Sequence, residues 1–180
     1  MADRLQRLLV IGGPGAGKST LAVRLGAALG LPVVHLDAHF WRPGWQETPR
    51  AEWAARVAEL AAAERWVMEG HYGGTLVIRA RAADLVVVLA PPRTTCVLRL
   101  VRRGLGDRGR ERHDLAPGCR EQVPDWTFLR EAWAFRATKL PGALNTLSSP
   151  AAQRADGTPP PVAILRTASE VERFVADVCR

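Results

Sequence analysis

Residues 12–19 read Gly-Gly-Pro-Gly-Ala-Gly-Lys-Ser and fit the pattern G-x-x-x-x-G-K-[S/T] at every position. This pattern is typical of a loop that wraps a polyphosphate with backbone N–H groups, because glycine puts no side chain in the way. Residues 7–11 form a short apolar run before it, and residues 18–29 repeat apolar side chains on one helical face after it. Strand, glycine loop and helix in this order predict a phosphate site at a helix N-terminus.

The bound molecule is expected to be a nucleoside triphosphate, with ATP and Mg²⁺ as cofactors. Lys18 supplies a positive charge for the β- and γ-phosphates, and the Ser19 hydroxyl is a ligand of the type that binds Mg²⁺. The predicted nucleotide-binding residues of the loop and first helical turn are Gly13, Pro14, Gly15, Ala16, Gly17, Lys18, Ser19 and Thr20.

Strand-like and helix-like segments alternate along the rest of the chain. The further expected strands are residues 32–36, 65–69, 84–90 and 162–165. The run at 84–90 is apolar throughout, apart from its first residue, which is typical of a central parallel strand covered on both faces. This alternation predicts an α/β fold, a three-layer α/β/α sandwich around a five-stranded parallel sheet, with the ligand at the carboxyl ends of the strands.

The composition is that of one globular domain covering residues 1–180. Apolar residues make up 47%, and no apolar run is long enough to cross a membrane. The three cysteines, Cys96, Cys119 and Cys179, are widely spaced and form no metal motif, so we expect a reducing, cytoplasmic environment. The net charge of +7 suits either polyanionic substrates or nucleic acid. We expect a monomer or a homodimer, with no membrane partner.

Four segments together resemble the bacterial DNA topology modulation proteins (FlaR-like), which are relatives of the adenylate kinase-type P-loop kinases. They are IGGPGAGKSTLA (11–22), LPVVHLDAHFWRPGWQETPR (31–50), MEGHY (68–72) and RAADLVVVL (81–89) before Pro-Pro-Arg. The family usually carries Asn where His71 stands. The resemblance implies the nucleoside monophosphate kinase type of P-loop fold, with an acceptor lobe at about 38–64 and a lid at about 104–120. We interpret that lid as a mobile flap, charged and glycine-rich, with almost nothing to bury.

The acceptor of the phosphoryl group is expected near Asp37, which follows a predicted strand. A carboxylate there can accept or orient the proton of an acceptor hydroxyl, although a turn or cap role is the alternative. Glu69 ends the next strand and is a candidate for Mg²⁺, together with Ser19, or for a salt bridge to an arginine. His35 is expected to be a packed strand residue. The expected acceptor-binding residues are Asp37, Phe40, Trp41, Trp45, Glu69, Tyr72 and Arg79.

Several arginines are candidates for neutralising the transferred phosphoryl group. Arg99 and Arg103 are four residues apart and share a helix face, and the resemblance implies that Arg99 stacks on the base while Arg103 reaches the phosphates. Arg108 and Arg110 are expected to close over the phosphates with the lid. The alternative is a solvated cationic helix face followed by an exposed charged loop. The predicted catalytic residues are Lys18, Asp37, Arg103, Arg108 and Arg110.

Three functions remain open at this point. The favoured one is ATP-dependent phosphoryl transfer to a small molecule, with a nucleoside or nucleotide as the best acceptor. The second is a nucleotide-regulated DNA-binding protein without a small-molecule acceptor, which the family name and the positive charge favour although no recognised DNA-binding motif is present. The third is a nucleotide-dependent switch that hydrolyses ATP slowly.

Overall fold

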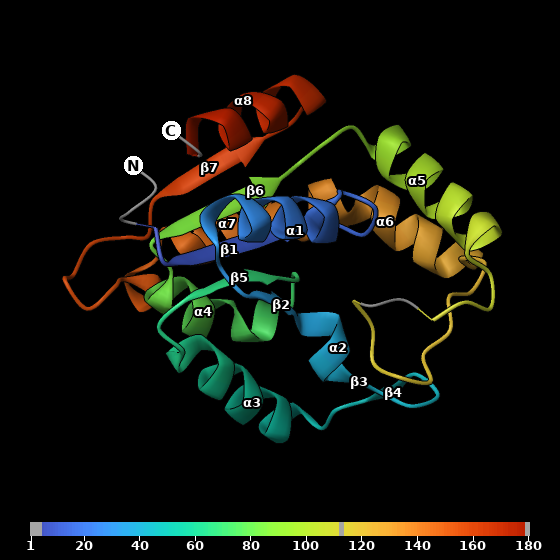
Figure 1. Cartoon of the computed structure of the whole chain (residues 1–180), viewed down its shortest axis with the longest axis horizontal. Helices are drawn as coiled ribbons and strands as arrows, with labels where there is room; N and C mark the ends of the chain where they lie inside the picture. Colours follow the sequence, from blue (N-terminus) through green and yellow to red (C-terminus); the bar gives the residue numbers. More distant parts are fainter. Residues whose placement is uncertain (1–4, 112–113, 179–180) are drawn as a thin grey trace.

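The computed structural model describes residues 5–111 and 114–178. Its main sheet has five parallel strands in the order β2-β5-β1-β6-β7, and helices cover both faces (Figure 1). The predicted three-layer α/β/α fold is therefore confirmed. The strands are β1 (Arg7–Gly12), β2 (Val33–His35), β5 (Trp66–Glu69), β6 (Leu85–Leu89) and β7 (Val162–Leu165).

The two helical layers differ in what they bury against the sheet. On one face, α1 (Lys18–Leu29) and α8 (Ala168–Val178) pack on Leu8, Val10 and Val87. On the other face, α3 (Arg50–Ala62), α4 (Leu76–Ala82) and α7 (Leu140–Leu147) pack on Leu9, Ile11 and the fully buried Trp66. Because alternate residues of β1 point to opposite faces, one strand serves both cores. The phosphate loop is thereby fixed to the central strand of the sheet.

The segment after β2 builds the floor of the site. It contains the short helix α2 (Leu36–Phe40) and a two-stranded hairpin of β3 (Trp41–Arg42) and β4 (Gln46–Glu47). Gly44 turns the hairpin with a φ of 77°, a left-handed conformation that glycine adopts without strain. The hairpin projects beyond the carboxyl ends of β2 and β5.

Two long helices border the site on the other side. They are α5 (Arg93–Gly106) and α6 (Trp126–Thr138), and the segment between them runs beside α2 and the hairpin (Figure 1). The predicted lid at 104–120 therefore begins inside α5, whose last residue is Gly106. Arg112 and His113 of the lid, and Cys179, lie outside the described residues. Within the described part of the chain, no helix combines the length and apolar character needed to span a bilayer.

Packing of the lid differs from the expectation that it has almost nothing to bury. Leu115, Ala116 and Cys119 are buried and pack against Trp41 and Trp45 of the hairpin. At the base of the lid, the amide of Gly109 donates to the carbonyl of Glu121. The expectation that the lid has almost nothing to bury was wrong, because its apolar residues follow no helical or strand periodicity and find their partners only in the folded chain. Its mobility stays a prediction.

Candidate active site

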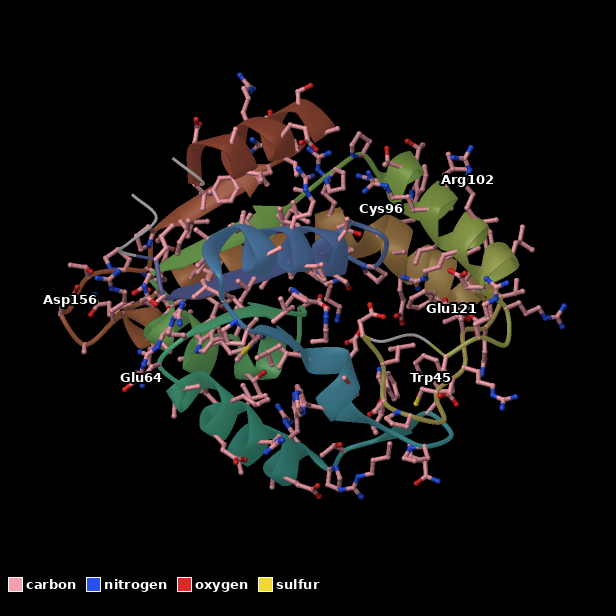
Figure 2. All side chains as sticks on the ribbon, viewed as in Figure 1. Trp45, Glu64, Cys96, Arg102, Glu121 and Asp156 are labelled. Atoms are coloured by element: carbon pink, nitrogen blue, oxygen red, sulfur yellow. The ribbon has the colours of Figure 1, made fainter. Side chains whose placement is uncertain are left out.

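A cavity of about 520 Å³ opens at the carboxyl ends of the strands, between the phosphate loop, the hairpin and the lid. Ligands of open parallel sheets bind at this edge. Trp45 and Glu121 lie at the cavity end of the molecule, far from Asp156 (Figure 2). The cavity is lined by Gly12, Pro14, Gly15, Lys18, Ser19, Asp37, Trp41, Trp45, His71, Tyr72, Leu100, Arg103, Leu115, Glu121, Gln122, Val123, Pro124, Asp125 and Phe128.

The phosphate loop has the backbone that its sequence requires. Gly15 and Gly17 adopt φ values of 73° and 97°, which side-chain-bearing residues rarely adopt. A Cβ on Gly15 would also lie 2.4 Å from the carbonyl oxygen of Cys96 in α5. Lys18 Nζ donates to the Gly13 carbonyl at 3.1 Å, so the ammonium is held across the loop. Pro14, Gly15, Lys18 and Ser19 face the cavity, whereas Gly13, Ala16, Gly17 and Thr20 do not line it.

Asp37 faces the cavity from α2 and carries the most chemically informative contact of the site. The Tyr72 hydroxyl donates to Asp37 Oδ1 at 2.5 Å. Burial raises the pKa of Asp37 above its ordinary value, while the charge of Lys18 and the Tyr72 hydrogen bond partly oppose that rise. The pKa of Tyr72 is also raised, first by burial and then by Asp37, so the phenol remains a proton donor. The pair presents a carboxylate of raised basicity to the cavity.

Tyr72 keeps this position through an unusual backbone. Its φ of 30° and the φ of 61° at Trp45 are left-handed, and both residues line the cavity. Positive φ at bulky residues costs energy and persists only where surrounding contacts impose it. At Tyr72 the contacts come from Arg79, whose guanidinium donates to the carbonyls of Gly70, His71 and Tyr72 at 2.8, 2.7 and 2.8 Å.

Arg79 therefore differs from its expected role as an acceptor ligand. Its side chain is fully buried, and its N–H groups are directed to backbone carbonyls of the β5–α4 loop. Burial lowers the pKa of Arg79, although a guanidinium stays protonated at neutral pH. Nor does Arg79 pair with Asp84, whose carboxylate accepts the amides of Gln6 and Arg7 instead. The residue braces the loop that carries Tyr72.

Ser19 and Glu69 lie together, as expected for a Mg²⁺ site. Ser19 Oγ donates to Glu69 Oε1 at 3.0 Å, and Glu69 is 2% exposed. A hydroxyl and a carboxylate beside the phosphate loop are the hard oxygen donors that Mg²⁺ prefers, so the residues fit the ion. The second partner of Glu69 Oε1 is His35 Nδ1 at 2.9 Å. Glu69 thus pairs with a histidine where an arginine was the alternative, and His35 is more than a packed strand residue.

Arg103 reaches the cavity from α5, but in a paired state. Its Nε donates to Glu121 Oε1 at 3.0 Å, and the Glu121 side chain is only 7% exposed. Arg99 lies one turn earlier, and its Nη1 donates to the carbonyl of Ala16 at 3.2 Å. Arg99 therefore contacts the phosphate loop from outside the cavity, while Arg103 contributes to the cavity wall. The two arginines share one helix face, as their spacing predicts.

Arg108 and Arg110 of the lid do not line the cavity. Arg108 and Arg110 are both exposed, and Arg110 pairs with Asp107 at 3.7 Å. Their expected role over the phosphates requires a movement that this structure does not contain. Their proposed contribution to catalysis stays a prediction.

Aromatic residues form the wall opposite the phosphate loop. Trp41 and Trp45 meet edge to face, with ring centroids 5.3 Å apart, and both line the cavity. Phe40 lies behind them and packs on Trp53 and Tyr72, so it supports the wall without lining the cavity. The wall therefore both faces the cavity and forms part of a hydrophobic cluster.

Sequence reasoning missed several residues of the cavity. No motif in the sequence indicated Glu121. The one usable signal is its position: an acidic residue directly after an arginine-rich lid is a candidate partner for those arginines. His71 belongs to the MEGHY segment (68–72) but was not expected in the site. Burial, followed by the charges of Arg79 and Lys18, lowers the pKa of His71 to about 4. The others come from α5 and the segment before and within α6: Leu100, Leu115, Gln122, Val123, Pro124, Asp125 and Phe128.

Neither a protein-family model nor a curated protein sequence matches the chain. Solved structures do. Shikimate kinase from Acinetobacter baumannii, in complex with shikimate, has a TM-score of 0.56 at 15% identity over 97% of this chain and 91% of that chain. Shikimate kinase from Bacteroides thetaiotaomicron has a TM-score of 0.53 at 19% identity over 97% and 96%. A gluconokinase from Sinorhizobium meliloti has a TM-score of 0.50 at 17% identity over 96% and 95%.

The chain has the fold of the P-loop kinases. At these identities the likeness establishes the architecture alone, since one fold hosts many activities. The named neighbours are two shikimate kinases and a gluconokinase, and neither an adenylate kinase nor a FlaR-like protein is among them. The finer resemblance drawn from the sequence therefore remains a prediction.

Proposed function

We propose that this protein transfers the γ-phosphoryl group of ATP to a hydroxyl group of a small molecule. The observation that carries the proposal is the placement of Lys18 and Asp37 on one cavity of about 520 Å³. Phosphoryl transfer needs a cationic cradle for the phosphates and a group that receives the acceptor proton, facing the same space. Kinase neighbours with the same fold support the proposal by analogy.

In the proposed reaction the acceptor oxygen attacks the γ-phosphorus in line with the bond to the β–γ bridging oxygen. That bond breaks, ADP leaves with the electron pair, and the acceptor proton passes to the Asp37 carboxylate. Lys18 and Arg103 balance the charge of the phosphates, and the aromatic wall excludes water. When bound, Mg²⁺ would be held by Ser19 and Glu69 and would neutralise phosphate charge.

The acceptor we favour is a nucleoside or nucleotide. Trp41 and Trp45 offer flat indole surfaces on the wall opposite the phosphate loop. Aromatic side chains stack on bases of any sequence, at about 1–3 kcal/mol per base. A sugar or hydroxy acid, by contrast, calls for a dense set of polar and charged groups, whereas the hairpin side of this cavity is lined by Trp41 and Trp45.

A nucleotide-regulated DNA-binding protein without a small-molecule acceptor remains the alternative function. Arg79 is buried and Arg103 is paired, so the cationic groups nearest the cavity already have partners inside the protein. Arg108 and Arg110 of the lid are exposed and do not line the cavity, so they suit either function.

An ADP-release assay tests the proposal. Nucleosides, nucleoside monophosphates, shikimate and gluconate are offered with ATP and Mg²⁺, and at least one acceptor is expected to raise ADP release well above the water background. Lys18→Ala should abolish nucleotide binding measured by calorimetry, whereas Asp37→Asn should retain it and lose transfer. Asp156→Asn is the matched control, because Asp156 lies at the far end of the molecule (Figure 2). Tight DNA binding unaffected by Lys18→Ala, with no acceptor found, would favour the alternative.

A further inference from the structure

Three potential metal ligands converge beside the carboxyl ends of β2 and β5. His35 ends β2, Glu69 ends β5, and Asp114 comes from the lid. One ligand atom of each lies within 4.8 Å of the others. The residues are separated by 34 and 45 positions in the sequence, so only the folded chain with its lid docked brings them together.

The surroundings of this triad favour a cation. Glu69 and Asp114 are 2% and 3% exposed, and the His35 side chain is 12% exposed. Two carboxylates at this depth carry a large desolvation cost, which is recovered only by hydrogen bonds and positive charge. Ser19 and His35 supply hydrogen bonds to Glu69, and Lys18 acts on the neighbouring Asp37. A divalent ion among the three side chains would neutralise both carboxylates at once.

The donor set indicates which ion. Mg²⁺ favours an all-oxygen octahedron and keeps much of its water. One imidazole nitrogen with two carboxylates is typical of first-row transition ions such as Mn²⁺ and Zn²⁺. The three ligand atoms lie within 4.8 Å of one another, and His35 Nδ1 is 2.9 Å from Glu69 Oε1. A pair at the 4.8 Å limit must draw closer by about 1.5 Å to share an ion with bonds of about 2.1 Å. Side-chain rotation of Asp114 and His35 covers such a distance.

We propose that His35, Glu69 and Asp114 form a site for a divalent transition-metal ion that binds without nucleotide and fixes the lid to the sheet. Leu115, Ala116 and Cys119 follow Asp114 directly and already pack on the hairpin. An ion on Asp114 therefore secures the start of the lid segment whose apolar residues close the cavity. This site shares Glu69 with the expected Mg²⁺ position but uses His35 and Asp114 in place of Ser19. It does not depend on the proposed kinase activity.

The test is a titration of the nucleotide-free protein with Mn²⁺, followed by electron paramagnetic resonance of the free ion. We expect one Mn²⁺ per chain, with Mg²⁺ a weak competitor. His35→Gln and Asp114→Asn should each weaken binding at least about tenfold. Asp107→Asn, which changes an exposed carboxylate at the start of the lid, should leave it unchanged. No uptake without nucleotide, or equal effects of all three variants, would overturn the proposal.

Amide hydrogen exchange provides a measurement that needs no variant. Mn²⁺ should slow exchange across residues 114–121 of the unmodified protein, and unchanged exchange there would contradict the proposal even if the variants fail to fold. Because neither measurement includes ATP or an acceptor, failure of the metal site and failure of the kinase proposal give separate results.

Discussion

The phenol of Tyr72 and the carboxylate of Asp37 are joined by a hydrogen bond of 2.5 Å across the floor of the cavity. The two residues come from different elements, Tyr72 from the loop after β5 and Asp37 from α2. Burial raises the pKa of Asp37, and the phenol opposes that rise by stabilising the charged form. The basicity of the candidate catalytic carboxylate is therefore set by its burial, opposed by the charge of Lys18 and by this hydrogen bond.

Tyr72→Phe should move the acidic limb of the pH profile to higher pH. Without the phenolic donor, the pKa of Asp37 rises further, so the carboxylate is protonated over a wider range. We expect a shift in kcat/KM with pH and a loss of about tenfold or less in maximal rate. Phe40→Leu, which changes ring packing against Tyr72 but leaves the hydroxyl, is the control. An unmoved profile would show that Asp37 is not the titrating base.

Asp37→Asn should stabilise the protein while it abolishes transfer. The folded pKa of Asp37 lies above the ordinary value of 3.8, so its contribution to stability is greatest below that pH and is lost as pH rises through the folded pKa. Asparagine keeps an oxygen for Tyr72 and carries no buried charge. At pH 7 we expect a gain of about 1 kcal/mol in the free energy of unfolding, measured with denaturant. A variant less stable than the parent would contradict this account.

Glu121 should compete with the phosphates of the nucleotide for Arg103. Phosphate can take Arg103 only by displacing the buried Glu121 carboxylate, which pairs with it at 3.0 Å. Glu121→Gln removes that competition, and we expect ATP to bind several-fold more tightly by calorimetry. Arg103→Ala should lower kcat by about a thousandfold if the guanidinium stabilises the transferring phosphoryl group. Equal ATP affinity in the parent and Glu121→Gln would indicate that Arg103 keeps its carboxylate partner during binding.

His71 should make the protein sensitive to mild acid. Its pKa is lowered from 6.5 to about 4, and its buried Nδ1 lacks a hydrogen-bond partner in the described structure. Stability from the neutral ring is complete above pH 6.5 and is lost as pH falls toward 4, because the unfolded chain takes up the proton first. In His71→Asn the difference in denaturation midpoint between pH 7 and pH 5 should shrink. An identical difference in both proteins would rule out this source of acid sensitivity.

Local signals in the sequence predicted the frame of the molecule well. The phosphate loop and the central apolar strand depend on neighbours within a few residues, and so do the helix caps that the structure shows at Asp125 and Thr167. Asp125 Oδ1 accepts the amide of Phe128 at 2.7 Å, and Thr167 Oγ1 accepts the amide of Glu170 at 3.2 Å. Interactions of this range are encoded in short patterns, so they can be read before the fold is known.

Features that depend on distant partners were beyond the sequence. Helix α7 begins Leu-Pro-Gly, and the proline and glycine conceal a helix whose proline occupies the first turn, where its missing N–H costs nothing. The burial of the lid required Trp41 and Trp45, which lie about 70 positions earlier. Nothing in the pattern around Arg79 indicates whether it faces the cavity or the backbone.

The inward direction of Arg79 has a consequence for how the site would evolve or be engineered. Its guanidinium grips three successive peptide oxygens with a planar fork that a lysine ammonium cannot reproduce. The orientation of the Tyr72 phenol toward Asp37 thus depends on Arg79, which does not line the cavity. An attempt to alter the reactivity of the site would therefore start at Arg79, a buried cation beneath the cavity that solvent does not reach.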